Sequence, residues 1–252
     1  MHDDDDGYWK RISDKIPSDT TDQFTSRRLL TRVIGLRTGL SILDLGCGDG
    51  RAVDWLRKLD QTIDYRGADI EKSPEVISRT RTDALFDTYN GRDLPYKDER
   101  FDIVFSNQVF EHVEQPGPLL RDVARVLKPA GIFCGSVSQL EPYHSYSLWN
   151  YTIYGWDRLL EANGLRVTEF RPGIDGITLI MRSIDGQKRK FSQFFDKDSP
   201  IHRRIERKGR LSNISQKQIN HRKIVYSGHF LWIAEKHNNK SDQERLTAIG
   251  LE

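Results

Sequence analysis

The chain has 252 residues, of which 37% are hydrophobic and 30% charged, and its formal net charge is +2. These values favour one large globular domain, or one domain with an insertion, and no apolar run reaches the roughly 18 residues of a membrane-spanning helix. The first residues lack the apolar stretch of a secretory signal peptide. The two cysteines, Cys47 and Cys134, have no metal-like spacing, so we expect reduced thiols, no metal site and a cytoplasmic protein.

The expected elements follow from apolar runs that alternate with amphipathic segments. After a polar beginning, residues 25–36 carry an apolar stripe with helical spacing. Short, mostly apolar runs predict seven strands, at residues 41–46, 63–70, 83–90, 101–106, 131–137, 165–170 and 229–236. Helical patterns lie between them, at residues 51–59, 74–80, 119–127 and 156–164.

This alternation predicts an α/β fold, with a mainly parallel seven-stranded sheet covered by helices on both faces. Ligands of such sheets bind at the carboxyl ends of the strands. A basic segment interrupts the order before the last strand. Between residues 182 and 223 there are six Lys and seven Arg against three Asp and one Glu, a net charge of +9.

A glycine-rich stretch, ILDLGCGDG at residues 42–50, follows the first expected strand. Glycine has no Cβ, so the backbone can come close to a ligand here. Asp69 ends the second expected strand, where a carboxylate can accept two hydrogen bonds from a ribose. The G-x-G-x-G spacing and the neighbouring Asp44 differ from the G-x-G-x-x-G of dinucleotide sites, because a carboxylate repels a pyrophosphate and attracts an ammonium group. A ribose plus an ammonium group indicates S-adenosylmethionine (SAM).

At these residues the chain resembles the class I SAM-dependent methyltransferases, in their small-molecule, type 11-like branch. ILDLGCGDG resembles the first family motif and GADI the second, residues 89–113 resemble the third and fourth, and residues 119–137 the helix and strand that follow. The resemblance covers about residues 40–172 and the final strand, 228–236. It implies a Rossmann-like, doubly wound fold and SAM as the cofactor.

The resemblance assigns cofactor contacts residue by residue. They are Asp44, Gly46, Cys47, Gly48, Asp69, Ile70, Asn90, Gly91, Asn107 and Gln108. By resemblance, Asp44 meets the amino group of SAM, Asp69 the ribose hydroxyls and Ile70 the adenine face. Asn90 stands where family members commonly have an Asp that accepts the adenine amino group, and Asp93 is a nearby substitute.

The chain is divided accordingly. We expect an N-terminal lid or helix (1–40), a SAM-binding methyltransferase domain (41–182 and 225–237), a basic insertion (183–224) and a C-terminal tail (238–252). Tyr8 and Trp9 are candidates for a lid over the cofactor.

Two histidines are candidate catalytic bases, because a neutral imidazole can take a hydroxyl proton near neutral pH. His112 lies in FEHVEQP, after the fourth expected strand, and His144 lies in EPYHSYS, after the fifth. A structural role is the alternative for each. The imidazole of His144 belongs to an aromatic-rich segment with Tyr143, Tyr146, Trp149, Tyr151, Tyr154 and Trp156. These rings suit either an acceptor pocket for a sugar or polyketide-like ring, or a packed loop over the sheet.

The basic insertion has three interpretations. It is a pair of solvated helices, or a surface for an anionic partner such as a nucleotide-sugar, a phospholipid-linked glycan or a bilayer, or a nucleic-acid surface. Phe191, Phe194 and Phe195 beside basic residues favour a peripheral membrane contact. No recognisable nucleic-acid module accompanies the basic cluster, so nucleic acid is the least favoured partner.

The function expected from the resemblance is SAM-dependent methyl transfer, to an oxygen of a small molecule or a glycan. SNQV follows the fourth strand, in place of the family's amino-methylating signature N/D-P-P-Y/F, and this absence weakens a DNA amino group or a glutamine amide as the acceptor. A weaker resemblance suggests methyltransferases of cell-surface polysaccharide pathways. The alternatives are a non-catalytic SAM-binding scaffold or regulator, and an RNA methyltransferase that uses the basic insertion.

Overall fold

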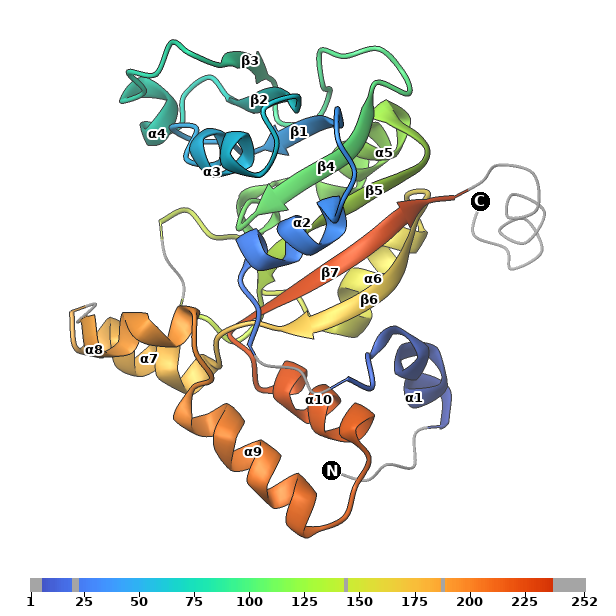
Figure 1. The fold of residues 1–252 in the computed structure, drawn as a ribbon, viewed down its shortest axis with the longest axis vertical. Coiled ribbons are helices and arrows are strands. Elements are labelled where there is room, and N and C mark those ends of the chain that lie inside the picture. The colour runs from blue at the N-terminus through green and yellow to red at the C-terminus, as the bar shows by residue number, and fades with distance from the viewer. Residues whose placement is uncertain (1–5, 20–22, 143–144, 187–188, 238–252) are drawn as a thin grey trace.

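The structure is a computed structural model that describes residues 6–19, 23–142, 145–186 and 189–237. Its centre is one seven-stranded sheet with the order β3-β2-β1-β4-β5-β7-β6 (Figure 1). The strands are β1 Ser41–Leu45, β2 Asp64–Ile70, β3 Leu85–Tyr89, β4 Phe101–Asn107, β5 Leu127–Ser138, β6 Leu165–Pro172 and β7 His229–Lys236. All seven expected strands are therefore confirmed, although β5 begins four residues earlier than its expected start at residue 131.

The sheet is parallel except for β7. Strands β1 to β5 pair in parallel, whereas β7 lies antiparallel between β5 and β6. The carboxyl ends of β1 to β6 consequently share one edge of the sheet, and β7 begins at that same edge. This is the mainly parallel α/β architecture that the sequence predicts.

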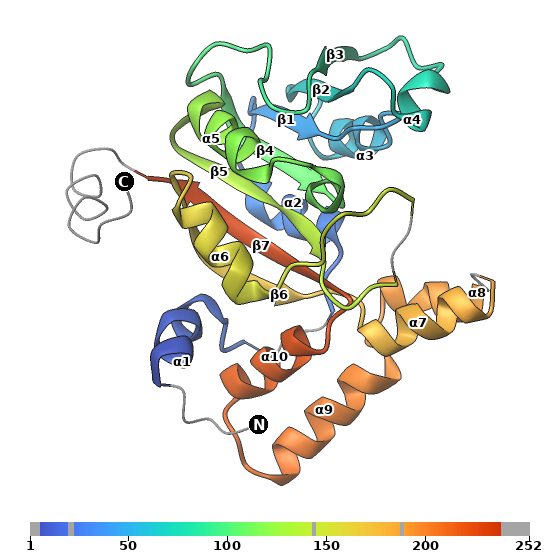
Figure 2. The same ribbon diagram turned by 180° about the vertical axis from the view of Figure 1, so that it is seen from behind.

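Helices cover both faces of the sheet (Figures 1 and 2). One face carries α2 Ser26–Ile34 and α3 Ala52–Leu59, and the other carries α1 Asp6–Ile12, α5 Pro116–Val126 and α6 Ile153–Glu161. Leu29 and Leu56 represent the first layer, and Leu120 and Trp156 represent the second. All four side chains are buried, because the apolar stripe of each helix faces the sheet.

Helix α1 was not expected from the sequence. Its position depends on contacts with distant residues: Ile12 and Ile16 are buried in the core, and Arg11 and Lys15 both form ion pairs with the buried Asp157 of α6. Such tertiary contacts stabilise a short helix that its own sequence would leave marginal.

A helical appendage joins β6 to β7 and lies beyond the carboxyl edge of the sheet (Figure 1). It consists of α7 Gly176–Ile184, α8 Arg189–Ser192, the 3-10 turn Gln193–Phe195, α9 Pro200–Leu211 and α10 Gln216–Val225. The helical segment thus begins at Gly176, before the boundary of 183 drawn for the basic insertion. Within the described ranges, no helix is both long enough and apolar enough to span a membrane.

Candidate active site at the carboxyl edge of the sheet

The glycine-rich turn that follows β1 requires glycine. Gly46, Gly48 and Gly50 have φ values of +73°, +52° and +84°, a region that side chains with a Cβ avoid. At Gly46 a Cβ would also lie 2.2 Å from Cγ2 of Val109. The turn is tied to the neighbouring strand, since the Gly46 N–H donates to the Ala68 carbonyl at 2.7 Å. The backbone of this loop is therefore held in one position by its hydrogen bond to Ala68 and by close packing against Val109.

Asp69, at the end of β2, faces the glycine loop. Its carboxylate accepts the N–H of Gly48 at 2.7 Å and that of Ile70 at 2.8 Å, which fixes its orientation. The carboxylate is mostly buried, and burial raises its pKa above the ordinary value. Beside it the apolar side chain of Ile70 is 43% exposed. A fixed carboxylate next to an uncovered apolar side chain suits a ribose and the flat face of an adenine.

Asp44 lies in the middle of the sheet, next to this loop. It is buried, and the Tyr65 hydroxyl donates to its Oδ2 at 2.8 Å. Burial raises the pKa of Asp44 to about 7, opposed by the Tyr65 hydrogen bond, and nearby Asp69 raises it further while Arg79 lowers it. Asp44 therefore has a structural partner and also changes charge near neutral pH.

Arg79 is a loop residue that the sequence did not point to. Its Nε and Nη2 donate to the Gly48 carbonyl at 2.9 and 2.5 Å, and its guanidinium lies 4.1 Å from the centre of the Phe86 ring. Helix α4, Pro74–Ile77, has a single turn, and the chain then places Arg79 against the loop. No motif marks an arginine for this role. Arg79 buttresses the loop and supplies positive charge near Asp69 and Asp44.

The thiol of Cys47 is buried beside this arginine, with Sγ 3.5 Å from Nη2 of Arg79. Burial is the largest cause that raises its pKa, and the nearby carboxylate of Asp44 adds to the rise. A thiol that stays protonated is a packing group and not a nucleophile.

Asn90 and Gly91 form a turn after β3. The Asn90 Oδ1 accepts the N–H groups of Arg92 and Asp93 at 2.9 and 2.8 Å, and its Nδ2 donates to the Asp93 carboxylate at 2.8 Å. Gly91 has a φ of +84°. The amide oxygen expected to receive an adenine amino group is thus engaged by the loop itself, while the Asp93 side chain is exposed.

A row of hydrogen-bonded side chains begins where β4 ends, beside the glycine loop. The Ser136 hydroxyl contacts Asn107 Oδ1 at 2.8 Å, Gln108 Nε2 at 3.1 Å and the Ser26 hydroxyl at 2.9 Å. Gln108 adopts a φ of +56°, which non-glycine residues seldom do. Asn107 and Gln108 are therefore held by the ends of β5 and α2, next to the loop where the cofactor contacts are predicted.

The row continues across β5 to β7. The Ser138 hydroxyl lies 3.1 Å from Gln108 Oε1, 3.2 Å from Glu111 Oε1 and 2.5 Å from Glu141 Oε2. Oε2 of Glu141 also lies 2.7 Å from Nε2 of His229, close enough for an ion pair, although the angle is poor for a hydrogen bond. We call this row the polar chain; its members are Ser26, Asn107, Gln108, Glu111, Ser136, Ser138, Glu141 and His229.

Glu111 is the buried acid of the polar chain. Its Oε2 has no hydrogen-bond partner among the described residues, and burial raises its pKa to about 8, with a further rise from Glu141. Glu111 is therefore protonated at neutral pH. This agrees with the geometry, because the single hydroxyl hydrogen of Ser138 cannot serve three acceptors, and a carboxylic acid can donate to it. Neither Glu111 nor His229 was predicted as a site residue, since Ser138 and Glu141 link them only in the folded chain.

Of the two histidines predicted as bases, the structure describes only one. His112 lies in the 3-10 turn Phe110–His112 and is half-buried. His144 lies outside the described residues. The structure therefore places only His112 at the carboxyl edge, one residue after Glu111.

The aromatic-rich segment divides between core and surface. Trp156 is fully buried against Phe110 and Trp232, whereas Tyr146 is exposed. Tyr154 packs on Tyr8, and Tyr143 lies outside the described residues.

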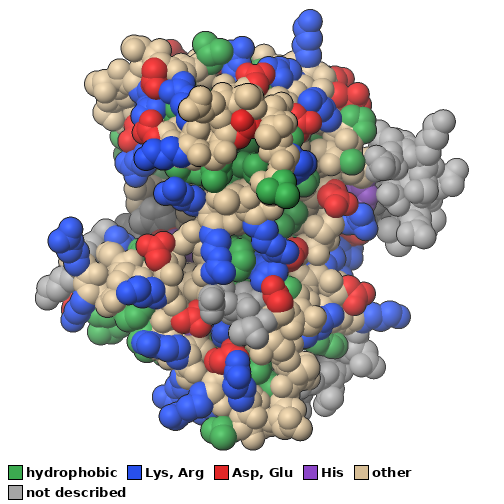
Figure 3. Space-filling view, viewed as in Figure 1, with side chains coloured by type: hydrophobic (Ala, Val, Ile, Leu, Met, Phe, Trp, Pro, Cys, Tyr) green, Lys and Arg blue, Asp and Glu red, His purple; other side chains and the backbone are tan. Residues whose placement is uncertain are grey.

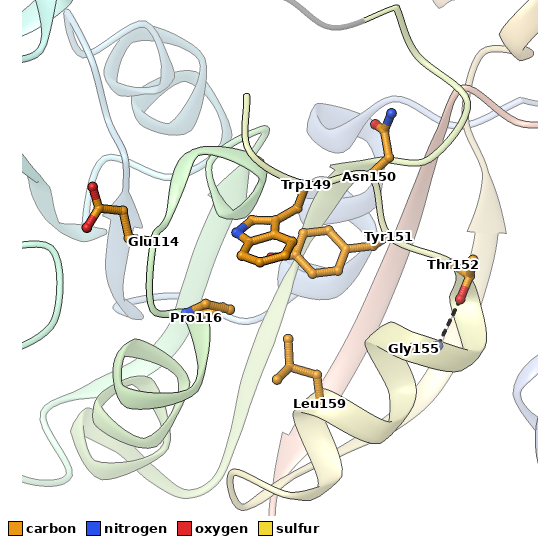
Figure 4. A pocket seen from close by; sticks show the side chains of 8 residues that line it. All are labelled: Glu114, Pro116, Trp149, Asn150, Tyr151, Thr152, Gly155 and Leu159. Atoms are coloured by element: carbon orange, nitrogen blue, oxygen red, sulfur yellow. Dashed lines mark hydrogen bonds between the residues drawn. The ribbon is translucent and has the colours of Figure 1, made fainter. Parts of the chain in front are cut away.

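Two other rings of this segment, Trp149 and Tyr151, line a pocket of about 520 Å³ (Figure 4). Both are anchored on the segment before α5: Trp149 Nε1 donates to the Val113 carbonyl at 2.8 Å and the Tyr151 hydroxyl to the Phe110 carbonyl at 3.0 Å. The full lining is Glu114, Pro116, Trp149, Asn150, Tyr151, Thr152, Gly155 and Leu159.

The aromatic residues near the start of the chain lie away from the glycine loop. The Tyr8 hydroxyl is 2.9 Å from Nε2 of His221, and the Trp9 ring packs edge-on against the same imidazole. Their described contacts are thus with α10 and α6, and not with the residues expected to hold the cofactor.

Comparisons with known proteins agree with this geometry. A family described as "Methyltransferase domain" matches residues 43–135. The chain is 30% identical over 133 residues to "Methyltransferase GfsG" of Streptomyces halstedii, covering 50% of this chain and 47% of that protein. It is 28% identical over 131 residues to the "27-O-demethylrifamycin SV methyltransferase" of Amycolatopsis mediterranei, with the same coverage. The chain thus spans about half the length of these curated relatives.

The fold is shared with a solved structure. The S-adenosylmethionine-dependent methyltransferase from Mesorhizobium loti aligns over 84% of this chain and 98% of its own, with a TM-score of 0.53 and 16% identity. At 16% sequence identity, this similarity is evidence for a shared fold and not for a shared activity.

Proposed function

We propose that the chain is a class I SAM-dependent methyltransferase, which its match to a methyltransferase family over residues 43–135 supports, and that it transfers the methyl group of SAM to a hydroxyl oxygen of a small molecule or a glycan. The observation that carries the proposal is the pair formed by Asp69 and Gly48 at the carboxyl edge, with the polar chain beginning next to it. Asp69 and the glycine loop would hold the adenosine of SAM, and the polar chain offers side chains that can accept a proton.

The residues present fit the cofactor. Asp69 is oriented by two backbone N–H groups and keeps lone pairs for the ribose hydroxyls, and Ile70 offers an exposed apolar surface for the adenine. By the family resemblance, Asp44 and the glycine turn would meet the methionine end of SAM. When bound, SAM supplies an electrophilic methyl group on a sulfonium sulfur. The task of the chain is then to orient the acceptor and to receive its proton.

Two observations support an oxygen acceptor. The sequence at the end of β4 reads SNQV and lacks the N/D-P-P-Y/F signature of family members that methylate DNA amino groups or glutamine amides. The rifamycin relative is, by its printed name, an O-methyltransferase. As a finer proposal, the acceptor is a glycan of a cell-surface polysaccharide pathway. Its only support is the sequence resemblance and the helical appendage, which is rich in basic residues and lies at the carboxyl edge of the sheet.

The base is proposed from geometry. His112 and His144 remain candidates from the sequence. The described polar chain adds His229, which is positioned by Glu141 as catalytic imidazoles commonly are by a carboxylate. We propose that His229 receives the acceptor proton, and that Glu141 and Ser138 connect it to the residues beside the glycine loop.

Transfer from tritium-labelled SAM to a panel of acceptors tests the proposal. The panel contains hydroxylated polyketide-like rings, free sugars and polysaccharide fragments, with amines of matched shape as controls. We expect label in an alkali-stable ether of a hydroxylated acceptor. Label only in the amines would contradict an oxygen acceptor, and SAM binding without transfer to any acceptor would favour the scaffold alternative.

A further inference from the structure

Helix α7 exposes an unusually apolar face. Four large side chains spaced i, i+3, i+4 and i+7 lie on one side of the helix, and their exposed fractions are 54% for Ile177, 44% for Ile180, 41% for Met181 and 71% for Ile184. We call these four residues the α7 face. Soluble surfaces seldom place that many large aliphatic side chains together without a partner.

The helix that carries the α7 face is held firmly. Asp175 caps its first turn by accepting the Thr178 N–H at 2.8 Å, and Leu179 is buried. A Cβ at Gly176 would lie 2.7 Å from Cβ of Leu140, and one at Gly228 would lie 2.3 Å from a methyl carbon of Leu179. The buried side of α7 is thus packed tightly against the ends of β5 and β7, so the exposed side is a fixed surface.

The helices that follow α7 carry exposed basic side chains. Arg203, Arg204, Arg207 and Lys208 of α9 are exposed and form no salt bridge with any residue the structure describes. Arg189 and Lys190 of α8 are also exposed, and Lys190 forms an ion pair with Asp185 at 2.8 Å. Figure 3 shows hydrophobic side chains over α7 with Lys and Arg side chains close by.

The phenylalanines of the basic insertion are not the exposed apolar group. Phe191, Phe194 and Phe195 are each partly buried; the Arg182 guanidinium lies over the Phe195 ring, and that ring is 6.3 Å from the His229 ring. The uncovered apolar surface therefore belongs to α7, which precedes the insertion boundary drawn from the sequence.

We propose that the α7 face, together with the basic side chains of α8 and α9, docks the protein onto an anionic lipid bilayer. A fixed stripe of aliphatic side chains can enter the interfacial layer, and the basic residues complement the negative headgroups. Each Lys or Arg near such a surface adds about fivefold to partitioning. Because α7 and β6 meet at the carboxyl edge of the sheet, docking would bring the polar chain towards the membrane.

This inference rests on the proposed function in one respect: docking would bring the methyltransferase site to a membrane-associated acceptor. Docking itself is independent of methyl transfer, so either idea can fail alone.

Sedimentation of the full chain with vesicles tests the inference. Vesicles of phosphatidylcholine alone are compared with vesicles that also contain phosphatidylglycerol, at low and high salt. We expect binding to the anionic vesicles that weakens with salt. The double variant Ile180→Asp/Ile184→Asp should lose at least about tenfold in partitioning, because two charges would replace inserted aliphatic groups.

A matched control separates the α7 face from general surface apolarity. Leu36→Asp/Leu59→Asp changes two exposed leucines on the side of α2 and α3 and should bind like the unchanged protein. SAM titration of both double variants should give unchanged affinity, which shows that they are folded and that the cofactor site is intact.

Four results would overturn the proposal. The first is absence of binding to anionic vesicles, and the second is an equal loss in the α7 and control variants. The third is a molar mass, by light scattering, that halves in the α7 variant, because the α7 face would then be covered by a second copy of the chain. Salt-sensitive binding of RNA in place of vesicles would likewise reassign the basic surface to nucleic acid.

Discussion

The two sides of the candidate site are assembled in different ways. Around the glycine loop, the polar contacts join residues close in the chain: Gly48 to Asp69 and Asp44 to Tyr65 are each 21 residues apart. In the polar chain, Ser26 bonds to Ser136 across 110 residues, and Glu141 meets His229 from β7. The loop side is therefore built mainly from β1, β2 and the residues up to Arg79, with Val109 packed on Gly46, whereas the polar chain requires α2, β5 and β7 together.

Because the two sides are assembled differently, substitutions on each side should have different effects on binding and turnover. Changes on the loop side should alter cofactor affinity whatever the acceptor. Changes in the polar chain, apart from its predicted cofactor contacts Asn107 and Gln108, should alter turnover or stability and leave cofactor affinity nearly unchanged. The following substitutions test that separation.

The largest effect is expected for His229→Asn. Loss of a general base lowers the rate by about 10²–10⁴-fold, so methyl transfer should fall in that range while SAM affinity is unchanged. His112→Asn, made in parallel, should have a smaller effect on turnover. The measurement is the rate against pH for both variants. If His112→Asn removed activity and His229→Asn did not, the base would be the residue predicted from the sequence.

A loop substitution should act on binding and stability instead. Gly46→Ala combines a positive φ with a Cβ that clashes with Val109, so we expect a loss of about 2–4 kcal/mol in the free energy of unfolding, and weaker SAM binding. Gly39→Ala is the matched control, because Gly39 has a φ of +65° but no atom within 4 Å of its Cβ position. That control should lose only about 1 kcal/mol. Denaturant unfolding of both variants measures the difference, and equal losses would refute the close packing described for the loop.

Glu111 makes the stability of the polar-chain side depend on pH. Its pKa is about 8 in the folded chain, against an ordinary value of 4.5. Between these values the folded state keeps a proton that the unfolded state has lost, so this residue makes stability fall as pH rises from about 4.5 to 8. Glu111→Gln should remove that fall, on the order of 1–3 kcal/mol between pH 5 and 8.

The measurement is thermal unfolding across this pH range, with the exposed neighbour Glu114→Gln as the control. A slope that is the same in Glu111→Gln and in the unchanged protein would show that Glu111 ionises normally in the fold.

The smallest effect concerns Asp44, whose pKa is about 7. If its carboxylate attracts the ammonium group of SAM, the affinity should rise as pH increases towards 7, by at most about tenfold per pH unit, and then level off. Tyr65→Phe removes a hydrogen bond that lowers this pKa, so the midpoint should move to higher pH. Asp44→Asn should abolish the dependence. A flat profile in the unchanged protein would assign Asp44 to bracing the sheet.

The same contrast explains what could be predicted from the sequence. The strands, the glycine turn and Asp69 follow from local patterns, because hydrophobic period, glycine spacing and strand ends are properties of neighbouring residues. Arg79, Glu111 and His229 carry no such mark, since their roles arise from contacts between separate elements. The apolar face of α7 was also missed, because a helical stripe in the sequence looks the same whether it faces the core or solvent.

Calorimetric titration of the full chain with SAM, and in parallel with NAD, distinguishes a SAM site from a dinucleotide site. We expect binding of SAM alone, and a loss of about 10²-fold in Asp69→Ala, because a charged acceptor of two hydrogen bonds is removed. Binding of NAD alone, or SAM binding that Asp69→Ala leaves unchanged, would contradict this expectation.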